Sequence, residues 1–309
     1  MGNKIRKTST NMRDALLFID TCIFLDFYRA KGPDGKLAIL DLIDNNHDRI
    51  ITGEQVEMEY KKNRRALILK AVKSFKMPEW GTLDVPAFLE ETQAAKMIEK
   101  RKAEIKKQVK RITDQLKKVL EKPGDYDPVY QCLQRLFKAG GPCNLTRKNK
   151  EERLRNRIHS LARKRYVLGY PPRKPEDTSC GDGVNWEWIV HCATKSDRNI
   201  IIVSRDGDYG TSVDGKSAIN DWLSWEFKDR ISQQRGVILT NRLTAAFKMA
   251  AIAVTPEQVK EEDSMMEARS EAVQKIPAIP RVASPEERWQ QMWDNLQALD
   301  PSSRKTQTE

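Results

Sequence analysis

The stretch "LLFIDTCIFLDFYR" at residues 16–29 decides the fold, because an apolar run ends at Asp20 and then continues in a helix-like pattern. A short, fully apolar run of this kind is typical of a strand that is buried on both faces of a parallel sheet. Strands alternating with helices predict an α/β domain with three layers, α/β/α, around a parallel central sheet. The other apolar runs of this type are "RIIT" at 49–52, "NIIIVS" at 199–204 and "GVILT" at 236–240.

Acidic residues recur where the predicted strands end. Asp20 and Asp206 follow two of the strands, and Asp182 stands at the start of the helical pattern before the third strand. Each of these acids alone could be only a helix cap or a turn residue. The carboxyl ends of the strands in such a sheet share one edge, so we expect these acids to meet there with Glu59. A cluster of like charges is costly unless a cation neutralises it, and oxygen ligands favour Mg²⁺ or Mn²⁺ over zinc.

Composition excludes several other classes of protein. The five cysteines form no C-x-x-C pair, which indicates reduced thiols in a cytosol. The N-terminus carries no signal-peptide pattern, and no apolar run approaches the length of a membrane span. The three histidines have no evident role, and no phosphate-binding glycine fingerprint is present. For this chain of 309 residues, these features predict a cytoplasmic protein that does not contact a membrane.

Positive charge is concentrated in one part of the chain. Residues 96–174 contain 24 Lys and Arg against 8 Asp and Glu, so this segment carries +16, whereas the remainder of the +11 chain carries −5. A concentrated basic segment attracts polyanions through counterion release, which predicts a nucleic-acid partner. The alternative is a lysine-rich helix whose charges are only solvated.

Apolar residues repeat at heptad spacing within this basic segment. Ile98, Ile105, Ile112 and Val119 lie seven apart, which predicts a helical arm with a seam over residues 98–119. The seam would permit self-association or a partner protein. We expect the arm to lie in an insertion over residues 87–170. The cations on this helix that are candidates for nucleic-acid binding are Lys106, Lys107, Lys110, Arg111, Lys117 and Lys118.

The C-terminal part of the chain differs from the rest. Residues 251–283 are charged and contain proline, and we interpret them as a linker. "SPEERWQQMWDNLQAL" at 284–299 starts with a capping box and places its aromatic and aliphatic residues on one face. We expect an amphipathic helix that docks on a partner protein, on a second subunit or on its own domain, followed by a disordered tail at 300–309.

Several motifs, in order, resemble those of a known family. The segments "FIDTCIFLD", "QVEMEYKKNR", "KRYVLGYPP", "CGDGVNWEWIV" and "IIIVSRDGDYG" are similar to successive motifs of the PIN-domain nucleases, in particular the bacterial PIN-like branch with a helical insertion. The similarity covers about residues 12–250, which we therefore interpret as one nuclease domain. The stretch "RKPEDTSCGD" departs from the usual family pattern.

This resemblance implies a metal-dependent endonuclease that usually acts on RNA through one or two Mg²⁺ or Mn²⁺ ions. The implied catalytic residues and metal ligands are Asp20, Glu59, Asp182 and Asp206, with Asp208 as a further ligand and Glu57 as an alternative to Glu59. Additional candidates for contact with nucleic acid are Asn63, Arg64, Arg65 and Ser204. Proteins of this kind are associated with stress response or defence against phage, which is analogy alone.

Three other classes compete with this interpretation. A catalytically silent module with the same fold could only bind RNA, and a DNA-directed nuclease subunit of a larger defence-type complex would share the same acids. A phosphatase of the haloacid-dehalogenase type needs a second aspartate two residues after the first, where this chain has Cys22. Cleavage of labelled RNA and DNA, with and without EDTA, separates the first two classes from an RNA-directed endonuclease.

Overall fold

The computed structural model describes residues 11–29, 37–75, 86–146, 152–173, 179–213 and 215–274. The chain divides into two compact units, residues 1–269 and residues 270–309. The first unit contains almost every element described below. Of the second unit, the structure describes only the last turn of one helix.

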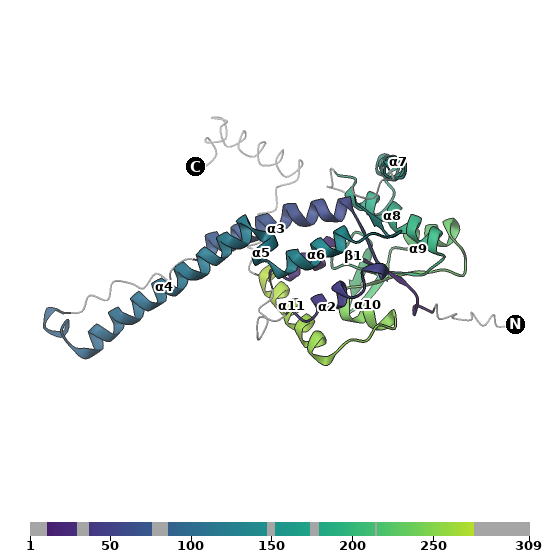
Figure 1. Ribbon diagram of the computed structural model, residues 1–309. Coiled ribbons are helices and arrows are strands. Elements are labelled where there is room, and N and C mark those ends of the chain that lie inside the picture. The colour runs from purple at the N-terminus through teal and green to yellow at the C-terminus, as the bar shows by residue number, and fades with distance from the viewer. Residues whose placement is uncertain are drawn as a thin grey trace, which may run out of the picture. The chain divides into compact units, whose positions relative to one another are not determined.

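A parallel sheet of five strands in the order β3-β2-β1-β4-β7 forms the centre of the first unit (Figure 1). The parallel sheet and its three-layer arrangement confirm the fold class predicted from the sequence. The four apolar runs form β1, β2, β4 and β7. The bounds are β1 Leu16–Ile19, β2 Ile50–Gly53, β3 Asn144–Leu145, β4 Ile200–Val203 and β7 Val237–Thr240.

The sheet reverses its direction of growth at β1, which lies between β2 and β4. β1 and β4 pair in parallel with Ile19 opposite Val203. Asp20 and Ser204 are therefore the next residues along these two strands and leave the sheet at the same edge. In open α/β sheets the crevice beside such a reversal is the usual place for a ligand.

Helices flank the sheet. α6 and α8 pack against β2, whereas α9 and α10 pack against β7. The bounds are α1 Thr21–Asp26, α2 Leu40–Asp44, α3 Glu54–Ser74, α4 Gln93–Glu121, α5 Pro123–Tyr126, α6 Pro128–Lys138, α7 Glu152–Leu168, α8 Gly181–Ser196, α9 Asp221–Arg230, α10 Leu243–Met249 and α11 Pro256–Gln274, with short 3-10 turns at His47–Arg49 and Ala87–Leu89.

Two features of the sheets have no counterpart in the sequence prediction. β3 lies inside the segment 87–170 that was interpreted as purely helical, and it adds an edge strand beside β2. A separate antiparallel hairpin, β5 Gly210–Val213 with β6 Lys216–Ile219, follows the third apolar strand. Both were missed for a physical reason: β3 has only two residues, and the hairpin side chains are largely exposed, so neither forms an apolar run.

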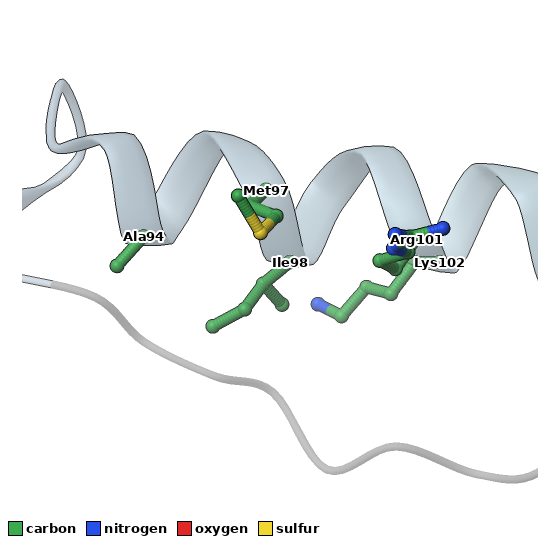
Figure 2. Close-up of a pocket in the computed structure, with 5 residues that line it drawn as sticks. All are labelled: Ala94, Met97, Ile98, Arg101 and Lys102. Atoms are coloured by element: carbon green, nitrogen blue, oxygen red, sulfur yellow. The ribbon is translucent and has the colours of Figure 1, made fainter.

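The helix predicted for the basic arm is α4. Its C-terminal part runs beside α3, and no residue of α4 is buried. Close to its N-terminus, Met97 and Ile98 remain 55% and 40% exposed beside Arg101 and Lys102 (Figure 2). The six cations proposed for nucleic-acid binding on α4 are all exposed. α4 therefore exposes both apolar side chains and basic side chains to solvent.

Arg64 joins α3 to the end of this arm. Its guanidinium donates to the carbonyl of Val119 at 2.7 Å and forms an ion pair with Asp127 at 2.6 Å, and the side chain is almost fully buried. Its Nε atom also donates to the Tyr28 hydroxyl at 3.1 Å. These donors of Arg64 thus face protein oxygens, and its contact with nucleic acid stays a prediction.

The segment 251–283, interpreted as a linker from its composition, contains α11. Residues of α11 up to Arg269 belong to the first unit. Glu261 accepts a hydrogen bond from the amide of Ile39 at 3.1 Å, and Met265 is 1% exposed. The charged composition gave no indication of this packing, because two of the acids, Glu261 and Glu262, are buried rather than solvated. The helix predicted over 284–299 and the tail at 300–309 lie outside the described residues.

Within the described ranges, no helix combines the length and the apolar character that crossing a membrane requires.

Candidate active site

The end of β1 and the end of β4 are joined by a hydrogen bond between side chains. The Ser204 hydroxyl donates to Asp20 Oδ2 at 2.6 Å, and the amide of Asp20 donates to the carbonyl of Val203 at 2.9 Å. Ser204 is 2% exposed and its Oγ also accepts from the amide of Asp206 at 3.1 Å. Ser204 thus orients both aspartates. The predicted contact of Ser204 with nucleic acid stays a prediction.

The loop that carries Asp206 is fixed by its neighbour Arg205. The Arg205 guanidinium contacts Asp26, donates to Glu262 at 3.1 Å and donates from Nε to the carbonyl of Asn241 at 3.0 Å. Asp26 and Glu262 are both fully buried. Asp206 therefore stands between two anchored residues, Ser204 and Arg205, and its carboxylate has little freedom to leave the edge of the sheet.

Glu59 reaches the same edge from α3. Its carboxylate accepts from the Thr21 hydroxyl at 3.1 Å and from the Gln55 amide at 2.5 Å. Glu57 points elsewhere, because it forms an ion pair with Lys61 at 2.5 Å on the same helix. The structure therefore brings Glu59, not the alternative Glu57, beside Asp20.

The first turn of α8 approaches Glu59 closely. A Cβ atom at Gly181 would lie 2.7 Å from Glu59 Oε1 and 2.5 Å from Gln55 Nε2, both too close for a real contact. Only glycine allows this approach without displacing the two side chains. The next residue, Asp182, lines the same cleft as Glu59.

A buried tyrosine lies among these acids. Burial raises the pKa of the Tyr209 phenol well above its usual value, and Asp182, Asp20, Glu59 and Asp208 raise it further. Four carboxylates thus act on one phenol. Tyr209 is 0% exposed, so this phenol lies in the core and does not face solvent.

The charge of Asp20 is destabilised in this setting. Burial raises its pKa from 3.8 to about 6, and the nearby carboxylates of Asp206 and Glu59 add to the increase, against the hydrogen bonds from Ser204 and Cys22. A bound cation would remove this penalty, because it favours the ionised form of every acid around it.

The donor atoms suit a divalent cation. One ligand atom from each of Asp20, Cys22 and Asp206 lies within 4.8 Å of the others. Burial, followed by the charges of Asp20 and Asp206, raises the pKa of the Cys22 thiol well above its usual value, so this thiol stays protonated and donates to Asp20 at 3.5 Å. The remaining donors are carboxylate oxygens, which Mg²⁺ and Mn²⁺ prefer.

Comparison with protein families gives a clear result. Residues 17–209 match the family of the PIN domain. The chain belongs to the PIN-domain family. The matched range starts in β1 and ends after Asp208, so it includes every acid of the cleft. No curated protein and no solved structure is significantly similar to the chain. PIN-domain membership points to a nuclease that binds nucleic acid.

The PIN domain of this chain gathers the predicted acids in one cleft of 460 Å³. Asn63 lines the cleft as well, whereas Arg65 is exposed on α3 and does not line it. The cations of α4 are not part of its lining. The predicted acids along the cleft are Asp20, Glu59, Asp182, Asp206 and Asp208.

Two arginines of the cleft were not predicted. Arg29 follows α1, and Arg269 belongs to α11, far along the chain from the acids. Arg29 stands in "DFYR" just after the first motif, which gave no signal beyond its charge. For Arg269 the sequence holds no signal, because only the packing of α11 brings it to the cleft.

The raised pKa of Asp20 makes stability depend on pH. In the folded protein its pKa is about 6, against 3.8 ordinarily. The folded state thus holds the proton more tightly, and stability falls as pH rises from about 4 through about 6, by at most about 3 kcal/mol. In EDTA, Asp20→Asn should therefore melt later than wild type at pH 8, and the gap should close toward pH 4. Thermal melts across this range test it, with Asp229→Asn, on the surface of α9, as control. A gap independent of pH would contradict the expectation.

The close approach at Gly181 predicts a selective defect. Gly181→Ala should displace the Gln55 and Glu59 side chains, which are flexible at their ends, and so leave the melting temperature almost unchanged. The affinity for Mn²⁺ should fall about tenfold, the lower end of the effect of disturbing a residue that supports a metal site. Gly183→Ala is the matched control, since its Cβ would meet only Ala162 at 3.6 Å. Titration calorimetry with Mn²⁺ measures both variants, and equal affinities would place Glu59 outside the ligand set.

Proposed function

We propose that this PIN-domain protein is a metal-dependent endonuclease that hydrolyses phosphodiester bonds, in RNA rather than DNA, with Mg²⁺ or Mn²⁺ held by its acidic cleft. The observation that supports this most is the convergence of five carboxylates, from four separate parts of the chain, on one cleft beside the ends of β1 and β4. The preference for RNA comes from the resemblance to PIN-domain nucleases.

The proposed role of each residue in the cleft is based on its contacts. Asp20, Glu59, Asp182 and Asp206 are the proposed catalytic residues and metal ligands, with Asp208 as a further ligand. Bound divalent ions would lower the pKa of a water molecule and stabilise charge on the attacking and leaving oxygens. Ser204 orients Asp20, and Thr21 orients Glu59. These two hydroxyls are positioning groups.

A nucleophilic side chain is not needed for this chemistry. The Ser204 hydroxyl is buried and engaged with Asp20, and the raised pKa of Cys22 keeps its thiol protonated. Protonated thiols are poor nucleophiles. The cleft therefore supports direct attack by water on the phosphodiester, rather than attack by a protein side chain that would form a covalent intermediate.

Removal of a single acid should abolish cleavage. Asp20→Asn, Asp182→Asn and Asp206→Asn should each lower the rate of RNA cleavage on the order of 10²-fold or more, because each removes a carboxylate that would hold the metal ion, and the metal ion would stabilise the negative charge of the transition state. Cleavage of a labelled RNA in Mg²⁺ and Mn²⁺ measures this, with Asp229→Asn as control and EDTA as a metal-free arm.

The same assay separates the competing functions. Cleavage of DNA in preference to RNA would replace the proposed substrate with that of a DNA-directed nuclease. Tight RNA binding by wild type with no cleavage in either metal would show a catalytically silent module and overturn the proposal.

The basic arm should govern binding of the substrate. Replacing Lys106, Lys107, Lys110 and Arg111 of α4 by glutamate should weaken RNA binding and flatten its salt dependence by about 0.7 in log–log slope for each phosphate that the protein no longer neutralises. Anisotropy titrations across salt concentrations measure the slope. Lys228→Glu with Lys248→Glu, both exposed and outside the arm, is the matched control. Unchanged binding with a lower melting temperature would assign the arm a role in packing or self-association through the seam.

A further inference from the structure

Asp26, at the end of α1, is a single buried carboxylate that contacts three arginines. It is 0% exposed. Arg29 Nη1 lies 2.5 Å from Asp26 Oδ1, Arg269 Nη1 lies 3.2 Å from Oδ2, and Arg205 also contacts Oδ2. One negative charge therefore holds three guanidinium groups in place.

A second buried acid accounts for only one of these cations. Glu262 is 0% exposed and shares Arg205 with Asp26 at 3.1 Å. Glu262 also accepts from the amides of Leu243 and Thr244, so its role is to tie α11 to α10. Asp26 is thus left with two further arginines, Arg29 and Arg269, of which Arg269 also contacts Asp206.

The two remaining arginines face the acidic cleft. Arg29 and Arg269 both line it, and their side chains are 31% and 24% exposed. Arg269 bridges the two groups, since Nη1 contacts Asp26 and Nη2 donates to Asp206 Oδ1 at 3.1 Å. Although burial disfavours its charged form, Asp26 and Asp206 raise the pKa of Arg269, which remains a cation at every pH of interest.

We propose that Arg29 and Arg269, anchored on Asp26, form a phosphate-binding subsite that holds the nucleic-acid backbone beside the acidic centre. This inference rests on the proposed nuclease function and names residues outside its ligand set. A guanidinium fixed from behind by a carboxylate presents its remaining N–H groups in the planar arrangement that matches a phosphate. Such a cation also offsets the repulsion between the backbone and the cleft acids, which is strong at short range.

Arg269 has a competing role as a plug. In this alternative, the contact of Arg269 with Asp206 prevents a cation from binding to that carboxylate, and Arg269 does not contact the substrate. The two roles differ in what the arginine does for RNA: a subsite increases affinity for RNA, whereas a plug leaves it unchanged.

The test uses the full chain with Asp182→Asn, which suppresses cleavage while RNA binding is measured in Mg²⁺. Arg29→Gln and Arg269→Gln are introduced singly and together, and Arg235→Gln, on an exposed pair with Asp197, is the matched control. A labelled single-stranded RNA is titrated by anisotropy across salt concentrations. We expect each variant to bind about tenfold more weakly, with a slope lower by about 0.7 for each phosphate involved. Arg269→Lys should restore part of the affinity and also covers the case in which Arg269→Gln fails to fold.

Unchanged RNA affinity and slope in the double variant would overturn the subsite, whether or not its affinity for Mn²⁺ rises. A melting temperature close to that of the parent shows that weaker binding does not come from unfolding. Failure of the proposed function is recognised separately, because it appears as absence of metal-dependent cleavage by the chain without substitutions, whatever the arginine variants do to binding.

Discussion

Parallel pairing of β1 with β4 is the constraint on which the site depends, because the register of these strands decides which side chains leave the sheet together. Ile19 lies opposite Val203, so Asp20 and Ser204 meet at the next step and form a hydrogen bond of 2.6 Å. A shift of the register by one residue would turn Asp20 away from its partner and bury an apolar side chain in its place. Asp206 depends on the same register, because its backbone amide donates a hydrogen bond to Ser204 Oγ. The acidic centre is therefore held in place by β1 and β4, each of which has four buried residues.

Charge compensation extends this centre beyond the segment that matches the PIN domain. The matched range ends at residue 209, yet Arg205 inside it is held by Glu262 of α11, and Asp206 is contacted by Arg269 of the same helix. A buried carboxylate such as Glu262 is stable only with partners that use its oxygens, and those partners are the α10 amides and Arg205. α11 up to Arg269 therefore belongs physically to the unit that carries the acidic cleft.

The sequence was sufficient to predict what depends on local pattern. Continuous apolar runs predicted four of the five parallel strands, and the carboxylates at their ends predicted the acidic edge. β3 could not be predicted, since two residues carry no periodicity and its pairing with β2 depends on the turn after α6. The burial of Arg64, which the sequence placed among the candidates for contact with nucleic acid, depends on Asp127, 63 residues away in the chain. Arg269 was missed because ion pairs across a fold leave no local signature, whereas a continuous apolar run does.

The distribution of charge links the two halves of the proposed function. The chain carries +11 overall, with its excess of cations in residues 96–174, which include the arm, while the cleft gathers five carboxylates. Basic charge on an exposed helix attracts a polyanion over a distance comparable to the Debye length, on the order of 8 Å in physiological salt, without selecting where it binds. At the cleft the sign is reversed, and a phosphate can approach only where a cation offsets the acids. In the proposed subsite Arg29 and Arg269 supply such charge permanently, because Asp26 holds them in place, and a bound divalent ion would supply the rest. Attraction of RNA to the arm and binding of a phosphate in the cleft are therefore separate steps. Only binding in the cleft depends on the metal ion that the proposed hydrolysis requires.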